Sequence, residues 1–250
     1  MDGHAFITGG GSGIGLAAAK TLAEAGWRVT IAGRTEARLR DVAKGIPGAR
    51  IQPLDVTDAE AVQAAFRATV AAAGPVSLLV NNAGSVVSAQ FEKTGAEQWR
   101  AMFDVHVMGA VHCTQAALPQ MKTSGWGRIV NIASTAGLIG YRSLSAYVAA
   151  KHALVGMTKA LALEVAKAGI TVNAICPGYV DTEIISSAVA KISERTQRSR
   201  EDALAMFTTV NPQGRLVKPQ EVAAAVLWLA SDTAAAVNGT ALPIAGGEVS

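Results

Sequence analysis

The feature that most constrains the fold of this chain is a regular alternation of short apolar runs with helical segments. Apolar runs of strand length occur at residues 5–8, 27–32, 49–54, 76–80, 128–133, 170–176 and 242–245. Helices are predicted between them at residues 16–25, 35–44, 58–73, 99–122 and about 147–168. Strands and helices that alternate in this way form parallel sheets with right-handed crossovers. The sequence therefore predicts an α/β fold, a doubly wound parallel sheet of about seven strands with helices on both faces.

The composition fits one such domain and excludes several classes of function. Half of the 250 residues are hydrophobic and 16% are charged, which is ample apolar material for a large core. No internal repeat and no Pro/Ser-rich linker interrupts the chain, so we assign residues 1–250 to a single domain. The 22 cationic and 19 anionic side chains form no dense basic run, and we expect no nucleic-acid partner.

The sequence also predicts the setting of the protein. No apolar run reaches membrane-spanning length, and the chain starts directly in a strand-like run, so we expect no membrane partner and no export signal. Cys113 and Cys176 lie far apart in apolar surroundings, which predicts buried, reduced thiols. We therefore expect a cytoplasmic protein without a metal site.

A glycine-rich turn joins the first predicted strand to the first helix. It runs from Gly9 to Gly15 and follows Thr8. Glycines let the backbone approach a pyrophosphate, and the N-terminus of the next helix offers free N–H groups and a positive dipole. A plain tight turn is the alternative, but the flanking strand and helix favour dinucleotide binding.

The end of the second predicted strand indicates which dinucleotide is bound. Folds that select NAD place Asp or Glu near this point, where it holds the ribose 2′-hydroxyl. Here Gly33 and Arg34 stand instead, and a guanidinium suits a 2′-phosphate. We predict NADP(H) as the favoured cofactor; NAD(H) is the alternative if Arg34 merely begins a solvated helix.

Proton transfer is expected on the helix that contains Tyr147 and Lys151. The residues around them are rich in Ala and include no Gly or Pro, and a spacing of four puts both side chains on one helix face. A neighbouring ammonium favours the phenolate, which makes the phenol a usable acid or base for a carbonyl or an alcohol. Alone, the pair equally fits a half-buried Tyr beside a solvated Lys.

Further motifs in order along the chain favour the catalytic interpretation. They are Thr8-Gly9-x-x-x-Gly13-Ile14-Gly15, Asn81-Asn82-Ala83-Gly84, Ser134, Tyr147-x-x-x-Lys151 and Pro177-Gly178. In this combination the chain closely resembles the short-chain dehydrogenase/reductase family over essentially its whole length, and among its members the 3-oxoacyl, 3-hydroxyacyl and hydroxybutyrate types. The resemblance implies a single-domain Rossmann fold, NAD(P)-dependent interconversion of ketones and secondary alcohols, and a homotetramer or homodimer.

The resemblance also implies roles for individual residues. Tyr147 would be the general acid or base, Lys151 would lower the pKa of Tyr147 and hold the nicotinamide ribose, and Ser134 would bind the substrate oxygen. Asp55 and Val56 would lie beside the adenine. The full set of expected cofactor contacts is Thr8, Gly9, Gly11, Ser12, Gly13, Ile14, Gly15, Arg34, Asp55, Val56, Asn82, Ala83, Gly84, Tyr147, Lys151, Pro177, Gly178, Val180 and Thr182.

One position departs from the family pattern. Members usually carry an Asn in the long helix, where it supports a water relay from the catalytic Lys to solvent, whereas this chain has His106. A His can also donate and accept a proton, and it titrates near neutrality. Our hypothesis is that His106 keeps the relay and adds a pH dependence. The alternative is a hydrogen-bonded His with little kinetic effect.

The substrate side is predicted at residues 183–215, a helical and polar insertion that would lie over the cleft as a lid. Cations in and after it suggest attraction to an anionic substrate such as an acyl-CoA thioester, or else belong to solvated helices. They are Lys191, Arg195, Arg198, Arg200, Arg215 and Lys218. Gln213 is a weaker candidate for the site. An apolar wall for a medium-sized carbonyl compound is expected from Leu138, Ile139, Tyr141 and Leu144.

The sequence thus predicts an NADP-dependent oxidoreductase for a small-molecule ketone or secondary alcohol, with 3-oxoacyl thioesters among its substrates. A small ketone, alcohol or polyol that is not a thioester is the alternative substrate. A catalytically silent dinucleotide-binding sensor is the alternative class, but a sensor has no need for the acid/base pair of Tyr147 and Lys151.

Overall fold

The computed structural model describes residues 3–249, which form one parallel sheet with seven strands. The strands are β1 (His4–Thr8), β2 (Arg28–Gly33), β3 (Arg50–Pro53), β4 (Leu78–Asn81), β5 (Gly127–Ile132), β6 (Ile170–Pro177) and β7 (Ala241–Ile244). Neighbouring strands pair in parallel in the order β3-β2-β1-β4-β5-β6-β7. The order reverses between β1 and β4, the point at which a doubly wound sheet binds its ligands. The predicted α/β fold is therefore confirmed.

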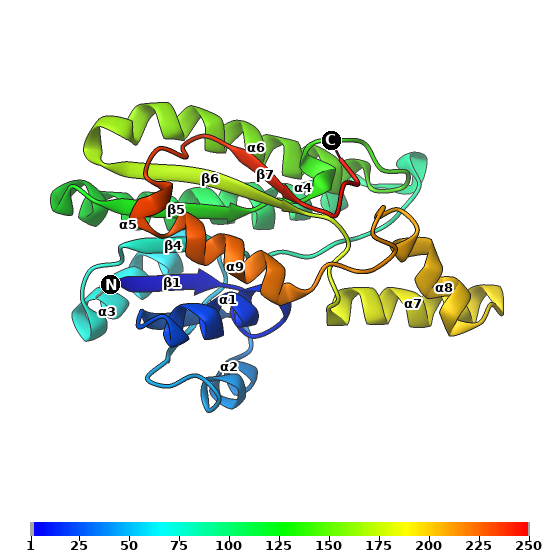
Figure 1. The fold of residues 1–250 in the computed structure, drawn as a ribbon, viewed down its shortest axis with the longest axis horizontal. Coiled ribbons are helices and arrows are strands. Elements are labelled where there is room, and N and C mark those ends of the chain that lie inside the picture. Colours follow the sequence, from blue (N-terminus) through cyan, green and yellow to red (C-terminus); the bar gives the residue numbers. More distant parts are fainter. Residues whose placement is uncertain (1–2, 250) are drawn as a thin grey trace.

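Helices cover both faces of the sheet (Figure 1). One face carries α1 (Gly13–Glu24), α2 (Glu36–Ala43) and α9 (Pro219–Leu229), and the other carries α3 (Ala59–Ala73), α5 (Gly109–Ser124) and α6 (Ser145–Val165). Successive strand side chains alternate between the faces, so Ile7 packs on the first and Phe6 on the second. Both side chains are fully buried, as expected for a parallel sheet covered on both sides.

The predicted continuous helix over residues 99–122 is wrong in one respect that shapes the site. The chain forms α4 (Ala96–Phe103), a π-helical segment (Asp104–Met108) and then α5. The Gly109 N–H donates to the Asp104 carbonyl, a spacing of five residues that widens the turn by one residue. The bulge contains His106, whose side chain is buried. A regular period of 3.6 residues gives no sign of such an insertion.

The sequence analysis assigned no helix to residues 219–229, where α9 lies. Pro219 occupies its first position, and the Glu221 carboxylate accepts a hydrogen bond of 2.7 Å from the Lys218 N–H. Both are ordinary signals of a helix start. The remaining short elements are 3-10 helices: η1 (Phe91–Lys93), η3 (Thr135–Gly137), η4 (Ala166–Ala168) and η5 (Asp232–Ala234).

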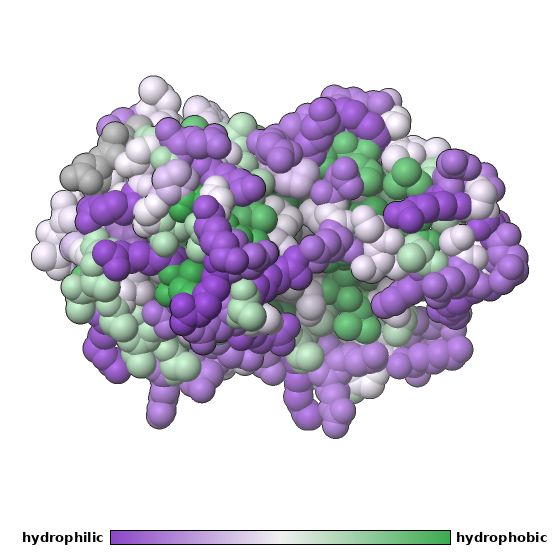
Figure 2. Space-filling view, turned by 90° about the horizontal axis from the view of Figure 1, so that it is seen from below, coloured by the Kyte–Doolittle hydropathy of each residue, from purple (hydrophilic) through white to green (hydrophobic). Residues whose placement is uncertain are grey.

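Residues 183–215 are largely helical, as predicted, and form α7 (Glu183–Thr196) and α8 (Arg200–Thr208). The two helices project beyond the carboxyl ends of the strands (Figure 1). Four large apolar side chains of this segment are exposed: Ile184, Leu204, Met206 and Val210. Figure 2 shows a mainly hydrophilic face on which hydrophobic side chains are visible between polar ones in both halves of the molecule.

Two properties of the described residues bear on the setting of the protein. Cys113 and Cys176 are free and buried, as predicted. No helix within residues 3–249 is both long enough and apolar enough to cross a membrane.

Candidate active site

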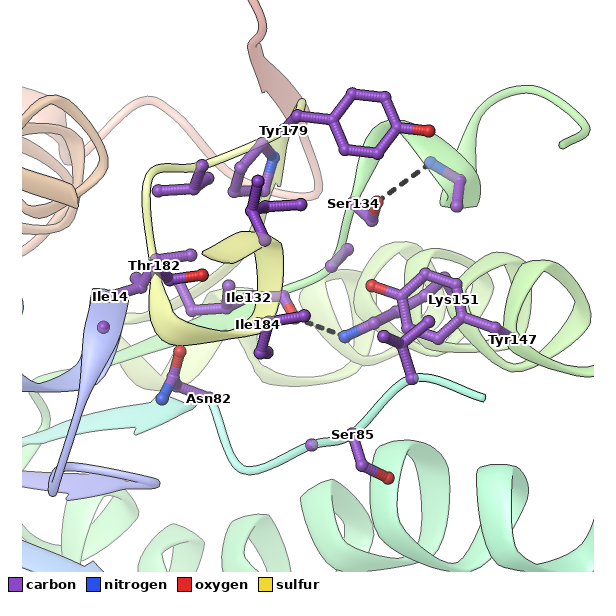
Figure 3. A pocket seen from close by; sticks show the side chains of 18 of the residues that line it. Ile14, Asn82, Ser85, Ile132, Ser134, Tyr147, Lys151, Tyr179, Thr182 and Ile184 are labelled. Atoms are coloured by element: carbon purple, nitrogen blue, oxygen red, sulfur yellow. Dashed lines mark hydrogen bonds between the residues drawn. The ribbon is translucent and has the colours of Figure 1, made fainter. Parts of the chain in front are cut away.

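A cleft of about 310 Å³ opens at the carboxyl ends of the central strands, where the strand order reverses. Its walls come from segments far apart in the sequence: the glycine-rich turn before α1, the loop after β4, the residues after β5, the first turns of α6 and the stretch 177–185. Figure 3 shows the side chains that line it. A cleft of this kind at this position is the expected ligand site of the fold.

Ser134, Tyr147 and Lys151 meet at one wall of the cleft (Figure 3). The Ser134 hydroxyl accepts a hydrogen bond of 3.1 Å from the Ala136 N–H and lies near enough to Tyr147 to affect the pKa of its phenol. Lys151 lies one helical turn after Tyr147, with its Nζ 5.6 Å from the centre of the Tyr147 ring. The same Nζ donates a hydrogen bond of 2.8 Å to the Ile132 carbonyl. The structure thus brings together the three residues expected to carry the chemistry.

Burial is the main influence on the protonation of this group. Burial raises the pKa of Tyr147 to about 12, although the Ser134 hydroxyl opposes the rise by stabilising the phenolate. Burial lowers the pKa of Lys151 to about 7, because a buried ammonium loses its hydration. The loss of hydration thus outweighs the lowering of the Tyr147 pKa that was expected from Lys151. Tyr147 is therefore protonated at neutral pH, and Lys151 loses its proton more easily than an exposed lysine does.

His106 lies against Tyr147, edge to face, with 5.2 Å between the ring centres. Its Nε2 is 2.7 Å from the Ser85 carbonyl. A carbonyl only accepts, so Nε2 carries the proton and Nδ1 is an acceptor. Burial, helped by the charge of Lys151, lowers the pKa of His106 to about 3. His106 is therefore neutral near pH 7, which corrects the expectation that it titrates near neutrality and adds a pH dependence.

A second, smaller cavity of about 10 Å³ is bordered by His106, Lys151 and Asn81. That is about the room that one water molecule needs. His106 Nδ1 and Asn81 Oδ1 are buried acceptors without a hydrogen-bond partner in residues 3–249. The cavity thus lies between two residues with unused acceptors and one amine.

The glycine-rich turn allows a ligand to approach its backbone closely. Gly9 and Gly13 have φ angles of 63° and 50°, which other residues rarely adopt. A Cβ on Gly15 would lie 2.4 Å from the Gly9 carbonyl oxygen. Ser12 precedes α1 and makes no side-chain capping bond, so the first N–H groups of the helix stay free. Because Gly9, Ser12, Gly13 and Ile14 border the cleft, these N–H groups are available to phosphate oxygens.

The loop after β4 braces this turn. The Thr8 hydroxyl accepts hydrogen bonds of 2.9 Å from the N–H groups of Asn82 and Ala83. Nδ2 of Asn82 donates to the carbonyls of Thr8 at 3.0 Å and Gly9 at 3.2 Å. Asn82 and Gly84 border the cleft, whereas Thr8 and Ala83 border the smaller cavity. Thr8 and Ala83 were expected to contact the cofactor, and in the structure they position the turn that borders its cleft.

The residues expected at the adenosine end lie beside the cleft and not in its wall. Arg34 is exposed directly after β2, and Asp55 follows β3, the neighbouring strand. The Thr57 N–H and hydroxyl donate to Asp55 at 3.0 and 2.8 Å. These bonds, with a smaller contribution from the Arg34 charge, lower the pKa of Asp55. Val56 is buried and packs closely on Gly109.

Arg38, in the first turn of α2 and four residues after Arg34, was not predicted as a site residue. Arg38 Nε donates 2.9 Å to the Gly11 carbonyl, and its Nη2 donates 2.5 Å to Glu183 at the start of α7. Gly11 is thus held by this side chain beside the cleft. The spacing from Arg34 gave no signal, because Arg34 precedes α2, which begins at Glu36, and the partners of Arg38 are distant in the sequence.

The stretch after β6 forms the wall opposite the glycine-rich turn. Pro177, Gly178, Val180 and Thr182 all border the cleft. A Cβ on Gly13 would lie 3.1 Å from Cγ2 of Thr182, so the two walls nearly touch at this point. Contact between these four residues and a nicotinamide stays a prediction.

The expected apolar wall is only partly correct. Tyr141 and Leu144 border the cleft, whereas Leu138 packs against buried residues of α6 and Ile139 is exposed. Apolar residues outside the predicted wall also border the cleft: Val86 and Tyr179 in loops, and Ile184 and Ile185 in the first turn of α7. Their place in the wall depends on tertiary packing, for which no local motif exists.

The cations of residues 183–218 do not border the cleft. Arg215 is bound by both carboxylate oxygens of Glu221 at 2.7 Å. Gln213 is exposed and also lies outside the cleft wall. The structure therefore favours the alternative that these charges belong to solvated helices.

Comparison with known proteins agrees with this geometry. The family model described as short chain dehydrogenase matches residues 3–193. The D-beta-hydroxybutyrate dehydrogenase of Rhizobium meliloti is 38% identical over 99% of this chain and 98% of its own. The acetoacetyl-CoA reductase of the same organism is 39% identical over 99% of both chains. The crystal structure of an actinorhodin polyketide ketoreductase variant with NADPH has a TM-score of 0.95 and 39% identity, and the match covers 99% of this chain and 97% of that one.

Proposed function

The chain belongs to the short-chain dehydrogenase family, and on this premise we propose that it interconverts a ketone and a secondary alcohol by hydride transfer with NADP(H). The observation that carries the proposal is the meeting of Ser134, Tyr147 and Lys151 in a cleft whose other wall is a glycine-rich turn. The relatives support the same reaction, since their names describe a hydroxy-acid dehydrogenase and carbonyl reductases.

The cleft fits a dinucleotide. The free N–H groups at the start of α1 suit the pyrophosphate. The glycine-rich turn can approach the pyrophosphate closely, because Gly15 has no Cβ that would clash with the Gly9 carbonyl. Arg34 is exposed at the end of β2 and suits a 2′-phosphate, which favours NADP(H) over NAD(H). When bound, the reduced nicotinamide supplies the hydride.

Tyr147 supplies the proton for the reduction. Its phenol is protonated at neutral pH, because its pKa is raised to about 12 by burial. A ketone oxygen becomes strongly basic as its carbon is reduced, so the phenol can donate to it only as the reaction proceeds. Ser134 binds the same oxygen and stabilises its developing charge. The phenolate that remains is stabilised by Ser134 and by protonated Lys151. Alcohol oxidation uses the same groups in reverse.

We further propose that His106 holds a water of the proton route beside Lys151 and does not itself carry the proton. A water in the cavity of about 10 Å³ would accept a hydrogen bond from Lys151 and donate to both His106 Nδ1 and Asn81 Oδ1. Such a water would satisfy two buried acceptors that have no partner within residues 3–249. His106 then acts as a neutral acceptor, since its pKa is lowered to about 3.

The substrate is a small carbonyl compound or its alcohol, and a 3-oxoacyl thioester is the first candidate. The acetoacetyl-CoA reductase relative supports this choice. We propose that residues 183–215 cover the substrate as a lid, because Ile184 and Ile185 border the cleft at the start of that segment. The exposed apolar side chains of the segment suit the rest of such a substrate.

We also propose that the protein is a cytoplasmic homotetramer or homodimer, built from one domain with its lid. Exposed apolar side chains support association, in particular Leu163 on α6, which is 83% exposed, and Met108. Light scattering of the purified protein would show a mass of two or four chains, and the mass of one chain would refute the proposal.

The experiment that tests the function is a panel of ketones and 3-oxoacyl thioesters with NADPH, followed by the absorbance of the reduced nicotinamide. A Ser134→Ala variant is the matched control, and it should lose ~10²-fold or more in kcat because a donor to the oxyanion is removed. If the protein binds NADPH but turns over no member of the panel, the silent sensor is the better account.

A further inference from the structure

We infer that the part of the cleft next to Tyr147 favours substrates whose reacting acyl portion is uncharged over free carboxylic acids, and that Glu248 determines this specificity. The inference rests on the proposed function, because it concerns the substrate of the same site. It distinguishes a free hydroxy acid from an acyl thioester as the substrate. Sequence identity does not distinguish them, because the hydroxybutyrate dehydrogenase relative is 38% identical and the acetoacetyl-CoA reductase relative is 39% identical.

Within residues 3–249, the cleft wall contains no exposed cation that could bind a substrate carboxylate. Of the described residues that border the cleft, Lys151 and Glu183 are the only Lys, Arg, Asp or Glu residues. Lys151 is buried and its Nζ donates to the Ile132 carbonyl. Glu183 is itself an anion and is paired with Arg38. The wall near Tyr147 otherwise consists of apolar side chains such as Leu144 and Ile184 and of uncharged polar ones such as Ser134.

A carboxylate lies directly behind this wall. The end of the chain folds back so that Glu248 accepts a hydrogen bond from the Tyr141 hydroxyl. Its other oxygen, Oε2, lies 2.4 Å from the position that a Cβ on Gly178 would take. Tyr141 and Gly178 both border the cleft. Glu248 is therefore separated from a bound substrate by a single layer of residues.

The charge of Glu248 is not neutralised by the protein. No Lys, Arg or His within residues 3–249 forms an ion pair with it. Its Oε2 is buried and accepts no hydrogen bond from that part of the chain. The field of Glu248 reaches the substrate wall, since it adds to burial in raising the pKa of Tyr179. An anion without a cationic partner beside the cleft repels a second anion bound in it.

The expected discrimination follows from Coulomb's law. Two like charges about 8 Å apart, at an effective dielectric constant of about 20, lower binding by roughly 10- to 100-fold. The desolvation of a substrate carboxylate without a cationic partner acts in the same direction. An ester or thioester of the same 3-oxo acid has neither disadvantage. The site therefore suits a substrate whose acid group is masked.

The test compares acetoacetate with ethyl acetoacetate, which share the reacting ketone and differ in charge. With NADPH, kcat/KM should be at least 10-fold higher for the ester. A Glu248→Gln variant keeps the size and the hydrogen bond from Tyr141 but removes the charge, so it should raise kcat/KM for acetoacetate about 10-fold and change that for the ester less than 3-fold. A Glu60→Gln variant on the surface of α3 makes the same change in net charge and should leave both values unaltered.

Equal kcat/KM for the two compounds in the wild type, or an unchanged ratio in Glu248→Gln, overturns the inference. If neither compound is reduced, calorimetry can measure the dissociation constants of acetoacetate and ethyl acetoacetate from the complex of the protein with NADP⁺, and these constants then test the inference. Equal constants again overturn it, and a 10-fold preference for the ester upholds it. The absence of turnover across a wider ketone panel would instead count against the proposed function, so the two failures are distinguishable.

Discussion

The burial of Lys151 leads to a prediction about the stability of the fold. Burial lowers the pKa of this amine from 10.5 to about 7. Between these values the unfolded chain holds a proton that the folded chain releases, so stability rises with pH across this window. Below about pH 7 both states are protonated, and the folded state carries the full disadvantage of a buried charge. At 1.36 kcal/mol for each pH unit, that disadvantage is about 5 kcal/mol.

Replacing Lys151 by Met should therefore stabilise the fold at pH 7 while it abolishes efficient catalysis. Met fills a similar volume without a charge, but the Ile132 carbonyl loses the hydrogen bond from Nζ, at a loss of about 1–2 kcal/mol. The net gain at pH 7 is about 2–3 kcal/mol, or roughly 5–10 °C in Tm for a chain of this size. The gain should shrink by about 3 kcal/mol between pH 7 and pH 9.5, because the wild type then releases its proton.

Guanidinium unfolding of the wild type and Lys151→Met, followed by circular dichroism from pH 6 to pH 9.5, measures this difference. Other titrating groups are common to both proteins and cancel. Lys167→Met, on an exposed lysine, is the control and should change stability by no more than about 0.5 kcal/mol. A variant that is less stable than the wild type at pH 7, or a gain that does not vary with pH, would refute the reasoning.

Three other substitutions test the site. Gly15→Ala should weaken NADPH binding by roughly 10-fold or more in a fluorescence titration, because its Cβ would lie 2.4 Å from the Gly9 carbonyl and displace the turn; unchanged affinity would contradict this. Arg34→Ala should raise the KM for NADPH by roughly 10-fold and leave that for NADH nearly unchanged, since only NADPH carries the 2′-phosphate; equal effects on both would show that Arg34 does not select the cofactor. His106→Asn should give pH–rate profiles that superimpose on the wild type between pH 5 and 9, because the pKa of His106 is lowered to about 3; a new inflection near neutrality would restore the pH-dependent role.

The fold was predictable because its signals are local and repeated. Apolar strand-length runs, glycine turns such as the one at Gly13, and helix starts such as Asp58, which accepts a hydrogen bond from the Ala61 N–H, lie next to one another in the sequence. The π-helical segment at His106 was not predictable in this way. It breaks the helical period by one residue, and tertiary packing against Tyr147 accompanies it.

The site was predictable where spacing alone fixes geometry, as for Tyr147 and Lys151 on one helix face. Arg38 and Glu248 were missed because their partners are distant in the sequence. Arg38 meets Glu183 across 145 positions, and Glu248 meets Tyr141 across 107. The protonation of the site depends on the same kind of information, since burial, and not the adjacent charge, has the larger effect on Tyr147.

The central claim is that the Tyr147 hydroxyl transfers the proton that accompanies hydride transfer. Tyr147→Phe removes that single oxygen and keeps the ring that packs against His106. Steady-state reduction of the best ketone with NADPH should show kcat lowered by ~10²-fold or more, while the dissociation constant for NADPH changes by less than about 3-fold. A variant that keeps kcat within 10-fold of the wild type would contradict the account.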